Sequence, residues 1–332
     1  MSLAASLLVA VVYTGPGSLP AGASTAAGHL APMSGSYVYA LTFHGVARDY
    51  RLHVPPAGAA GKPLPLVLNL HGATQSGILQ ESYSQMDAAS DQGGYLVAYP
   101  DGTTDTATNP SNLYSWDAGV CCALPVTHHV NDVSYLLDVI SDIAKRTPVN
   151  LRRVYVTGMS AGGMMAYRMA AEASRHIAAI ASISGQVELP SIHPARPVPT
   201  MEFHSINDPI AKWDGVDGKY SVMDGINKWV KADGCNPKPH DAAPIVGAAG
   251  TTSAGETATR VTYSGCRNGT QVVLWRLTGS GHVWPGSPLL GTKTTHILTG
   301  VGRGTTLINA DQLMWQFFQH YSLPATPKAG PN

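Results

Sequence analysis

A serine framed by glycines is the clearest sign of chemistry in the sequence. Residues 158–162 read Gly-Met-Ser-Ala-Gly and match the pattern G-x-S-x-G, with Ser160 at the centre. An apolar run precedes this motif and a helical pattern follows it. In that context the motif predicts a sharp strand-to-helix turn that exposes the serine hydroxyl, with glycines where side chains would clash with the neighbouring strand and helix. Ser160 is therefore the predicted nucleophile.

A serine hydroxyl needs a base, and a histidine base needs a carboxylate to orient it. Both types follow Ser160 in the order that hydrolases with this turn use, the acid first and the histidine last. Asp208 comes after an apolar run that ends at Phe203, and His282 comes after a run that ends at Leu277. The sequence therefore predicts a triad of Ser160, Asp208 and His282.

Other carboxylates compete for the role of the acid. Asp214 and Asp217 come shortly after Asp208 and are its realistic alternatives. Asp132 begins an amphipathic run behind Asn131, a candidate N-cap, so we expect it to be an N-terminal helix residue. Asp208 is the first choice and lies in the loop beyond the C-terminal end of its predicted strand.

Backbone N–H groups are expected to bind the oxyanion. Residues 71–75, His-Gly-Ala-Thr-Gln, follow an apolar run at the place where hydrolases with this turn donate one N–H. We predict Ala73 as that donor, with Thr74 as the alternative, and expect His71 to brace the loop. The second predicted donor is the N–H of Ala161, because the N-terminus of a helix favours negative charge.

Strand and helix patterns alternate along the chain and must position these residues. Residues 37–54 contain two runs that predict a hairpin around residues 44–45. Helical spacing of apolar residues predicts helices from Asp132, from just after Ser160 and near Asp311. This alternation predicts an α/β fold with a mainly parallel central sheet and helices on both faces. Nearly continuous apolar runs predict buried strands at residues 66–70, 95–99, 153–157, 198–203 and 272–277.

Composition excludes several classes of function. The chain has 332 residues, with 21 Lys plus Arg and 21 Asp plus Glu, so its formal net charge is zero. A nucleic-acid-binding protein normally has a basic excess. Hydrophobic residues make up 44% of the chain, yet no apolar window of about 18 residues outside the N-terminus predicts a membrane span. The 35 Gly and 24 Pro residues predict many loops, including a low-complexity loop at residues 247–259.

The first residues resemble a secretory signal peptide, although no Lys or Arg precedes the apolar run of residues 3–13. We expect residues 1–28 to be this leader, residues 29–325 to form a single catalytic domain and residues 326–332 to be a short tail. An even number of cysteines fits an exported chain. The expected location is therefore secreted or periplasmic. The four cysteines are Cys121, Cys122, Cys235 and Cys266.

An ordered set of motifs resembles the polyhydroxybutyrate-depolymerase-like esterase family, which also includes feruloyl and acetylxylan esterases. The matching segments run from about residue 37 to about residue 321. The resemblance implies an α/β-hydrolase fold, carboxylic-ester hydrolysis by a serine triad and no cofactor. It makes Ser160 the nucleophile, His282 the general base and then acid, and Asp208 the orienting acid. The motifs are HGATQSG, YPDG, SWDAGVCC, NDVSYLLDVI, VYVTGMSAGGMMAY, FHSINDPIAKWDG and SGHVWPG. One departure is Ala73, which stands where the family frequently has a cysteine.

Cys235 and Cys266 are expected to form a disulfide, because they lie between the last two predicted strands, each at a Gly-Cys step typical of loops. The family resemblance agrees with this pairing. Cys121 and Cys122 are then left to pair with each other, which adjacent cysteines do only through a tight turn.

Residues that contact a ligand are marked less clearly. Trp116 and Trp284 are predicted to form flat walls of the substrate pocket, with a position in the core as the alternative. Adjacent His128 and His129 point apart and lack two further ligands at metal spacing, so we expect no metal site.

Together these features predict a secreted single-domain serine esterase that needs no cofactor and binds neither nucleic acid nor membrane. Its partner is expected to be a small-molecule or oligomeric ester with a short acyl, hydroxycinnamoyl or 3-hydroxyalkanoate group. A serine peptidase of the same fold is one alternative. A non-catalytic binding protein on a hydrolase scaffold is another, although such proteins usually lose a triad residue.

Overall fold

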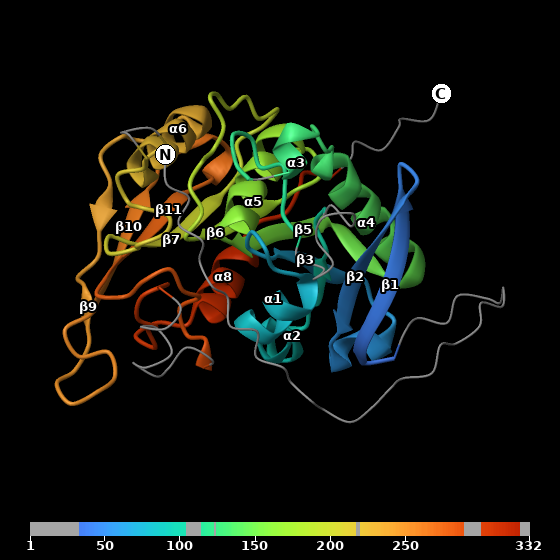
Figure 1. Ribbon diagram of the computed structural model, residues 1–332, viewed down its shortest axis with the longest axis horizontal. Helices are drawn as coiled ribbons and strands as arrows, with labels where there is room; N and C mark the ends of the chain where they lie inside the picture. The colour runs from blue at the N-terminus through green and yellow to red at the C-terminus, as the bar shows by residue number, and fades with distance from the viewer. Residues whose placement is uncertain (1–32, 104–113, 123, 217–219, 289–299, 326–332) are drawn as a thin grey trace. The chain divides into compact units, whose positions relative to one another are not determined.

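Eleven strands form one sheet in the part of the chain that the computed structural model describes, residues 33–103, 114–122, 124–216, 220–288 and 300–325. Figure 1 shows the sheet passing between two groups of helices. The strands are β1 (Gly35–Phe43), β2 (Val46–Val54), β3 (Leu64–Leu70), β4 (Leu96–Pro100), β5 (Val149–Met159), β6 (Ala179–Ile183), β7 (Thr200–Ser205), β8 (His240–Asp241), β9 (Ile245–Val246), β10 (Thr257–Tyr263) and β11 (Val272–Thr278). Their order is β1-β2-β4-β3-β5-β6-β7-β11-β10-β8, with β9 paired to β10.

The centre of the sheet is parallel, as the alternating patterns predict. Strands β4, β3, β5, β6, β7 and β11 pair in parallel from neighbour to neighbour. Every residue of β4 and β6 is buried, which fits apolar runs covered on both faces. Because parallel strands end on the same edge, the residues after β5, β7 and β11 emerge side by side. Ser160 follows β5, Asp208 follows β7 and His282 follows β11.

Antiparallel strands flank the parallel centre. β1 and β2 form the predicted hairpin, and His44 and Gly45 at its turn have φ angles of 49° and 80°. On the other side, β10 pairs antiparallel with β11. The expected loop at residues 247–259 is therefore too long, since its last three residues already belong to β10. The sequence also missed β6, because Ala-Ile-Ala-Ser-Ile is short and its small residues do not mark a strand.

Helices cover both faces of the sheet, as predicted (Figure 1). Side chains of α4 (Asp132–Arg146), α5 (Ala161–Glu172) and α6 (Val222–Asp233) share one hydrophobic core, and those of α2 (Met86–Gly93) and α8 (Ala310–Phe318) share the other. The Asn131 side chain caps α4 by accepting the Ser134 N–H at 3.1 Å, as expected. No described helix is long and apolar enough to cross a membrane. The other described helices are α1 (Gly77–Ser84), α3 (Leu124–Thr127), η1 (Pro56–Ala60) and η2 (Arg267–Gly269).

The four cysteines form two disulfides in the structure. Cys235 pairs with Cys266, which links the loop after α6 to the loop after β10. Cys121 pairs with its neighbour Cys122 in the loop that precedes α3. The structure thus contains both expected pairings, of which that of Cys235 with Cys266 also agrees with the family resemblance.

Candidate active site

Ser160 lies at the turn between β5 and α5. Its backbone angles are φ 55° and ψ −121°, a region that residues with side chains rarely adopt and that often marks functional sites. A Cβ on Gly162 would lie 2.2 Å from the Leu70 carbonyl oxygen, so α5 can approach β3 only because this residue is glycine. The Ser160 N–H donates to the Ile183 carbonyl at 2.8 Å. These constraints hold the half-buried Ser160 at the carboxyl edge of the sheet.

Asp208 and His282 are brought together by a hydrogen bond. The His282 Nδ1 donates to Asp208 Oδ2 at 2.8 Å. The other carboxylate oxygen, Oδ1, accepts the N–H groups of Ile210 and Ala211, each at 2.9 Å. With its proton on Nδ1, the neutral imidazole keeps Nε2 free to accept a proton from a nucleophile. The arrangement is that of a general base and its orienting carboxylate.

Asp208 is held as an anion although it is buried. Burial by itself raises the pKa of the carboxyl. The hydrogen bond and charge of His282, the charge of His204 and the Ile210 N–H together outweigh burial, so the pKa of Asp208 lies below its usual value. At neutral pH the carboxylate can therefore orient His282 and stabilise the imidazolium that forms during proton transfer.

The loops that carry Asp208 and His282 are joined to each other and to a later segment. The Asn207 side chain accepts the Gly279 N–H at 2.8 Å, and the His282 N–H donates to the Val301 carbonyl at 2.6 Å. Within the described residues no hydrogen bond joins the Ser160 hydroxyl to His282. Such contacts are often long without substrate and tighten in the reacting complex.

Of the alternative acids that the structure describes, neither Asp214 nor Asp132 is hydrogen-bonded to His282. Asp214 is exposed at a turn, and Asp217 lies outside the described residues. Asp132 is the first residue of α4, as expected, where it is buried and forms an ion pair with Arg48 at 2.8 Å. Its pKa is raised by burial, although Arg48 opposes this effect. The geometry thus favours Asp208 over Asp214 and Asp132.

The loop after β3 lies against Ser160. A Cβ on Gly72 would be 3.5 Å from the Ser160 Cβ, while the Gly72 N–H is already donated to the Gln75 side chain at 3.1 Å. Ala73, the predicted donor, is the next residue and is half-buried. Ala161 is the first residue of α5, and the first N–H groups of a helix have no partner within the helix. The two predicted donors thus belong to the chain segments that adjoin Ser160.

His71 braces this loop, as predicted, and is not a base. The side chain is fully buried, and burial lowers its pKa to about 4. The neutral ring accepts the Gly102 N–H at Nε2 (2.9 Å) and donates from Nδ1 to the Gly72 carbonyl (2.7 Å). The His71 carbonyl accepts the indole N–H of Trp116 at 2.9 Å.

Trp116 and Trp284 are core residues in this structure, so the predicted pocket walls are corrected here. Their exposed fractions are 0% and 1%. Each indole N–H is satisfied inside the protein, that of Trp116 by His71 and that of Trp284 by Asp311 at 3.0 Å. Neither ring presents a face to a ligand. The indoles support the loop after β3 and the segment after His282 instead.

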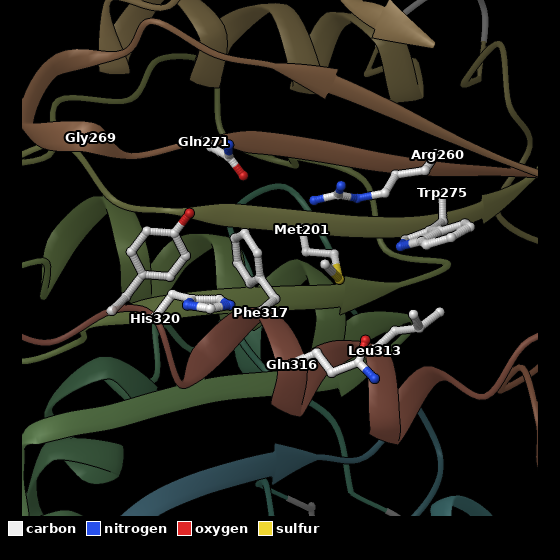
Figure 2. A pocket seen from close by; sticks show the side chains of 10 residues that line it. Met201, Arg260, Gly269, Gln271, Trp275, Leu313, Gln316, Phe317 and His320 are labelled. Carbon is white, nitrogen blue, oxygen red and sulfur yellow. The ribbon is translucent and has the colours of Figure 1, made fainter. Parts of the chain in front are cut away.

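A cavity of about 550 Å³ lies elsewhere, between α8 and the strands β7, β10 and β11 (Figure 2). Met201 of β7, Arg260 of β10 and Gln271, just before β11, line it together with side chains of α8. Its lining includes none of the three predicted triad residues. The cavity is therefore separate from the candidate active site.

Sequence reasoning missed two buried polar residues behind the triad, Glu202 and His204. They occupy alternate positions of β7, so both side chains point to the same face of the sheet. Two ionisable residues with this spacing in an otherwise apolar strand were the available signal. The same reasoning overlooked Asp311, a buried carboxylate in the first turn of α8.

The sheet, the strained serine turn and the Asp208–His282 pair define an α/β-hydrolase. In agreement, the fold resembles the acetyl xylan esterase from Aspergillus awamori, with a TM-score of 0.54 and 16% sequence identity, covering 80% of this chain and 100% of that one. At this identity the similarity concerns the fold.

Residues 48–230 match the family described as "Esterase PHB depolymerase", and the chain belongs to this family of carboxylic ester hydrolases. It is 30% identical over 266 residues to "Putative esterase NocK" of Nocardia uniformis subsp. tsuyamanensis, covering 73% of this chain and 72% of that protein. It is 28% identical over 242 residues to "Feruloyl esterase B" of Piromyces equi, covering 68% of this chain and 41% of the relative. A "Bifunctional acetylxylan esterase/xylanase XynS20E" of Neocallimastix patriciarum is 27% identical over 239 residues, covering 72% of this chain and 31% of the relative. The chain thus spans less than half the length of the last two proteins.

Proposed function

We propose that this carboxylesterase works through an acyl-enzyme on Ser160, with His282 as the base and Asp208 as its orienting acid. The observation that carries the proposal is the 2.8 Å hydrogen bond between His282 Nδ1 and Asp208 Oδ2 at the strand edge where Ser160 emerges. Because the pKa of the buried Asp208 lies below its usual value, the residue is a carboxylate that supports proton acceptance by the His282 imidazole.

In this mechanism the Ser160 oxygen attacks the ester carbonyl while His282 Nε2 takes the hydroxyl proton. The N–H groups of Ala73 and Ala161 hold the oxyanion of the tetrahedral intermediate. His282 then gives its proton to the departing alcohol, which leaves the acyl group on Ser160. Water, deprotonated by His282, attacks the acyl-enzyme and releases the acid.

We infer that the substrates are short acyl, hydroxycinnamoyl or 3-hydroxyalkanoate oligomer esters. The names of the relatives support this range, since they include feruloyl and acetylxylan esterases and a "Poly(3-hydroxyalkanoate) depolymerase C" of Paucimonas lemoignei, 29% identical over 160 residues. We rank these esters above long-chain triglycerides. Rates on p-nitrophenyl acetate, butyrate and palmitate, methyl ferulate and a 3-hydroxybutyrate oligomer test the ranking. A higher kcat/KM on palmitate than on butyrate would contradict it.

We also propose that the chain is exported and loses a leader near residue 28. That segment lies outside the described residues, and the proposal is supported by its composition and by the two disulfides, which persist in oxidising compartments. N-terminal sequencing of the protein from the culture medium or periplasm tests it. Retention of the intact N-terminus in the cytoplasm would contradict it.

Labelling with a fluorophosphonate tests the nucleophile. Ser160→Ala should fold with an unchanged melting temperature, lose the label and lose about 10⁴-fold or more in kcat. Ser184→Ala is the matched control, because Ser184 also has a positive φ (51°) at the end of a strand but is buried. The control should keep both label and activity. If Ser160→Ala kept about a third of the wild-type kcat, the nucleophile would have to be another residue.

A further inference from the structure

A second histidine lies directly behind the Asp208–His282 pair. His204 is fully buried at the end of β7, and both of its ring nitrogens have an acceptor within hydrogen-bond distance. Nδ1 lies 2.8 Å from Glu202 Oε1, and Nε2 lies 2.7 Å from the Ala211 carbonyl oxygen. Nε2 is also 3.9 Å from Asp208 Oδ2, the oxygen that accepts from His282.

The partners of His204 limit where its protons lie. A carbonyl oxygen only accepts hydrogen bonds, so Nε2 must carry a proton for Ala211. At Nδ1 the acceptor is a buried carboxylate, whose second oxygen accepts the Tyr167 hydroxyl at 3.1 Å. Burial raises the pKa of Glu202, and the hydrogen bond and charge of His204 oppose this effect. When Glu202 is ionised, a neutral imidazole with its proton on Nε2 would turn a lone pair toward the carboxylate. A proton on both nitrogens removes that repulsion and pairs an imidazolium with the carboxylate.

His204 also controls the backbone that holds Asp208. The carbonyl of Ala211 accepts from His204, and the N–H of the same residue donates to Asp208 Oδ1 at 2.9 Å. One residue thus links the two side chains mechanically. A charge at 3.9 Å in a buried site is also close enough to act on Asp208 electrostatically. His204 therefore affects both the position and the ionisation of Asp208.

We propose that His204 is a positioning residue of the reaction, a buried imidazolium paired with Glu202 that keeps Asp208 ionised and oriented toward His282. This inference rests on the proposed triad. It gives β7 two functions, since the strand delivers Asp208 at its end and supplies the ion pair that supports it. His204 itself touches neither Ser160 nor the reacting atoms.

The charged and titratable groups around this pair set the direction of its pH effect. Glu202 and Asp208 face His204 from its own chain segment, Tyr167 reaches Glu202 from α5, and His282 lies beyond Asp208. Tyr83 of α1 also lies near enough for the Asp208 charge to act on it. Removing one positive charge from this group makes its neighbours easier to protonate. The acid limb of kcat/KM must then move to higher pH.

Two variants remove that charge in different ways. His204→Gln keeps a side-chain amide in place of the imidazole. Glu202→Gln keeps His204 but removes the carboxylate that stabilises the imidazolium. The new amide can donate an N–H to Nδ1 of a neutral His204. Both should reduce kcat/KM about tenfold at about pH 5.5 and less than about threefold at about pH 8. His53→Gln is the matched control, because His53 on β2 also bridges two carboxylates, Asp87 at 3.3 Å and Asp91 at 2.8 Å.

Nitrogen-15 NMR of 15N-histidine-labelled wild-type protein measures the charge of the His204 ring in the unmodified enzyme. His204, assigned by its absence from His204→Gln or through backbone connectivities, should carry protons on both nitrogens from about pH 5 to about pH 8. A neutral His204 at about pH 7 would overturn the proposal, and so would an equal loss of kcat/KM at all pH values in both variants. If Ser160→Ala remained active, the proposed function would fail while the NMR result still decided the charge of His204.

Discussion

Replacing Asp311 with asparagine should stabilise the folded protein by an amount that grows with pH. Asp311 is buried in the first turn of α8, where Oδ1 accepts the indole N–H of Trp284 at 3.0 Å. Burial raises the pKa of this carboxyl to about 7, although the hydrogen bond from Trp284 opposes the effect. The carboxyl is therefore protonated in the folded protein at pH values where the unfolded chain has already lost that proton.

Proton linkage sets the sign and the size of the effect. Between the ordinary pKa of 3.8 and the folded value of about 7, the folded protein binds more protons than the unfolded chain. The free energy of unfolding therefore falls as the pH rises through this window. At about 1.4 kcal/mol per pH unit, the loss reaches about 4 kcal/mol by about pH 8. The N-terminus of α8 favours the anion by only about 0.3–1 kcal/mol, so burial decides. The asparagine side chain of the variant cannot ionise and still offers an acceptor to Trp284.

Urea unfolding of both proteins at several pH values, followed by tryptophan fluorescence, measures this difference. The stability of Asp311→Asn relative to wild type should increase by about 4 kcal/mol between about pH 4 and about pH 8. Burial also raises the pKa values of Asp87 and Asp233 to about 6, but their contributions cancel when the two proteins are compared. Exposed Asp214→Asn should show no such trend. A difference that stays constant over this pH range would refute a neutral, buried Asp311.

Three further predictions follow from the geometry. Asp208→Asn should lower kcat about 10⁴-fold by favouring the wrong tautomer of His282, whereas Asp214→Asn should have little effect. Assays of the two purified variants measure this, and a larger loss of kcat in Asp214→Asn than in Asp208→Asn would refute it. Replacing Cys235 and Cys266 by Ser should lower the free energy of unfolding by about 3–4 kcal/mol, because the disulfide closes a loop with a sequence separation of 31; an unchanged urea midpoint would contradict it. Gly162→Ala should destabilise by about 3 kcal/mol or more, since its Cβ would meet backbone at 2.2 Å; thermal unfolding checks this, and wild-type stability would show that the turn relaxes freely.

Much of the fold could be predicted because its signals are local. Hydrophobic period and capping within a few residues predict the hairpin of β1 and β2, the buried strands and the start of α4 directly after Asn131. β6 was not predicted, because its five residues are too few and too small to indicate a strand by themselves. They form a strand because they pair with β5 on one side and β7 on the other. The length of β10 was missed for a related reason, since pairing with β11 extends it into a stretch that reads as a loop.

The types and order of the site residues were determined by the sequence. Ser160 stands in a glycine-framed turn, and Asp208 and His282 follow apolar runs, so parallel strands must deliver all three to one edge of the sheet. The disulfide partners also agreed with the expected ones, Cys235 with Cys266 and, by elimination, Cys121 with Cys122.

Only the tertiary structure decided which carboxylate meets the histidine and which side chains face solvent. Asp208 and Asp214 are both acids in the same segment, and the difference is that one is hydrogen-bonded to His282 while the other is exposed. Trp116 proved to be buried, and His204 proved to lie between two carboxylates. Distances between residues remote in the chain, and the water excluded around them, arise when helices and strands pack. A sequence pattern with a period of two to four residues carries no information about either.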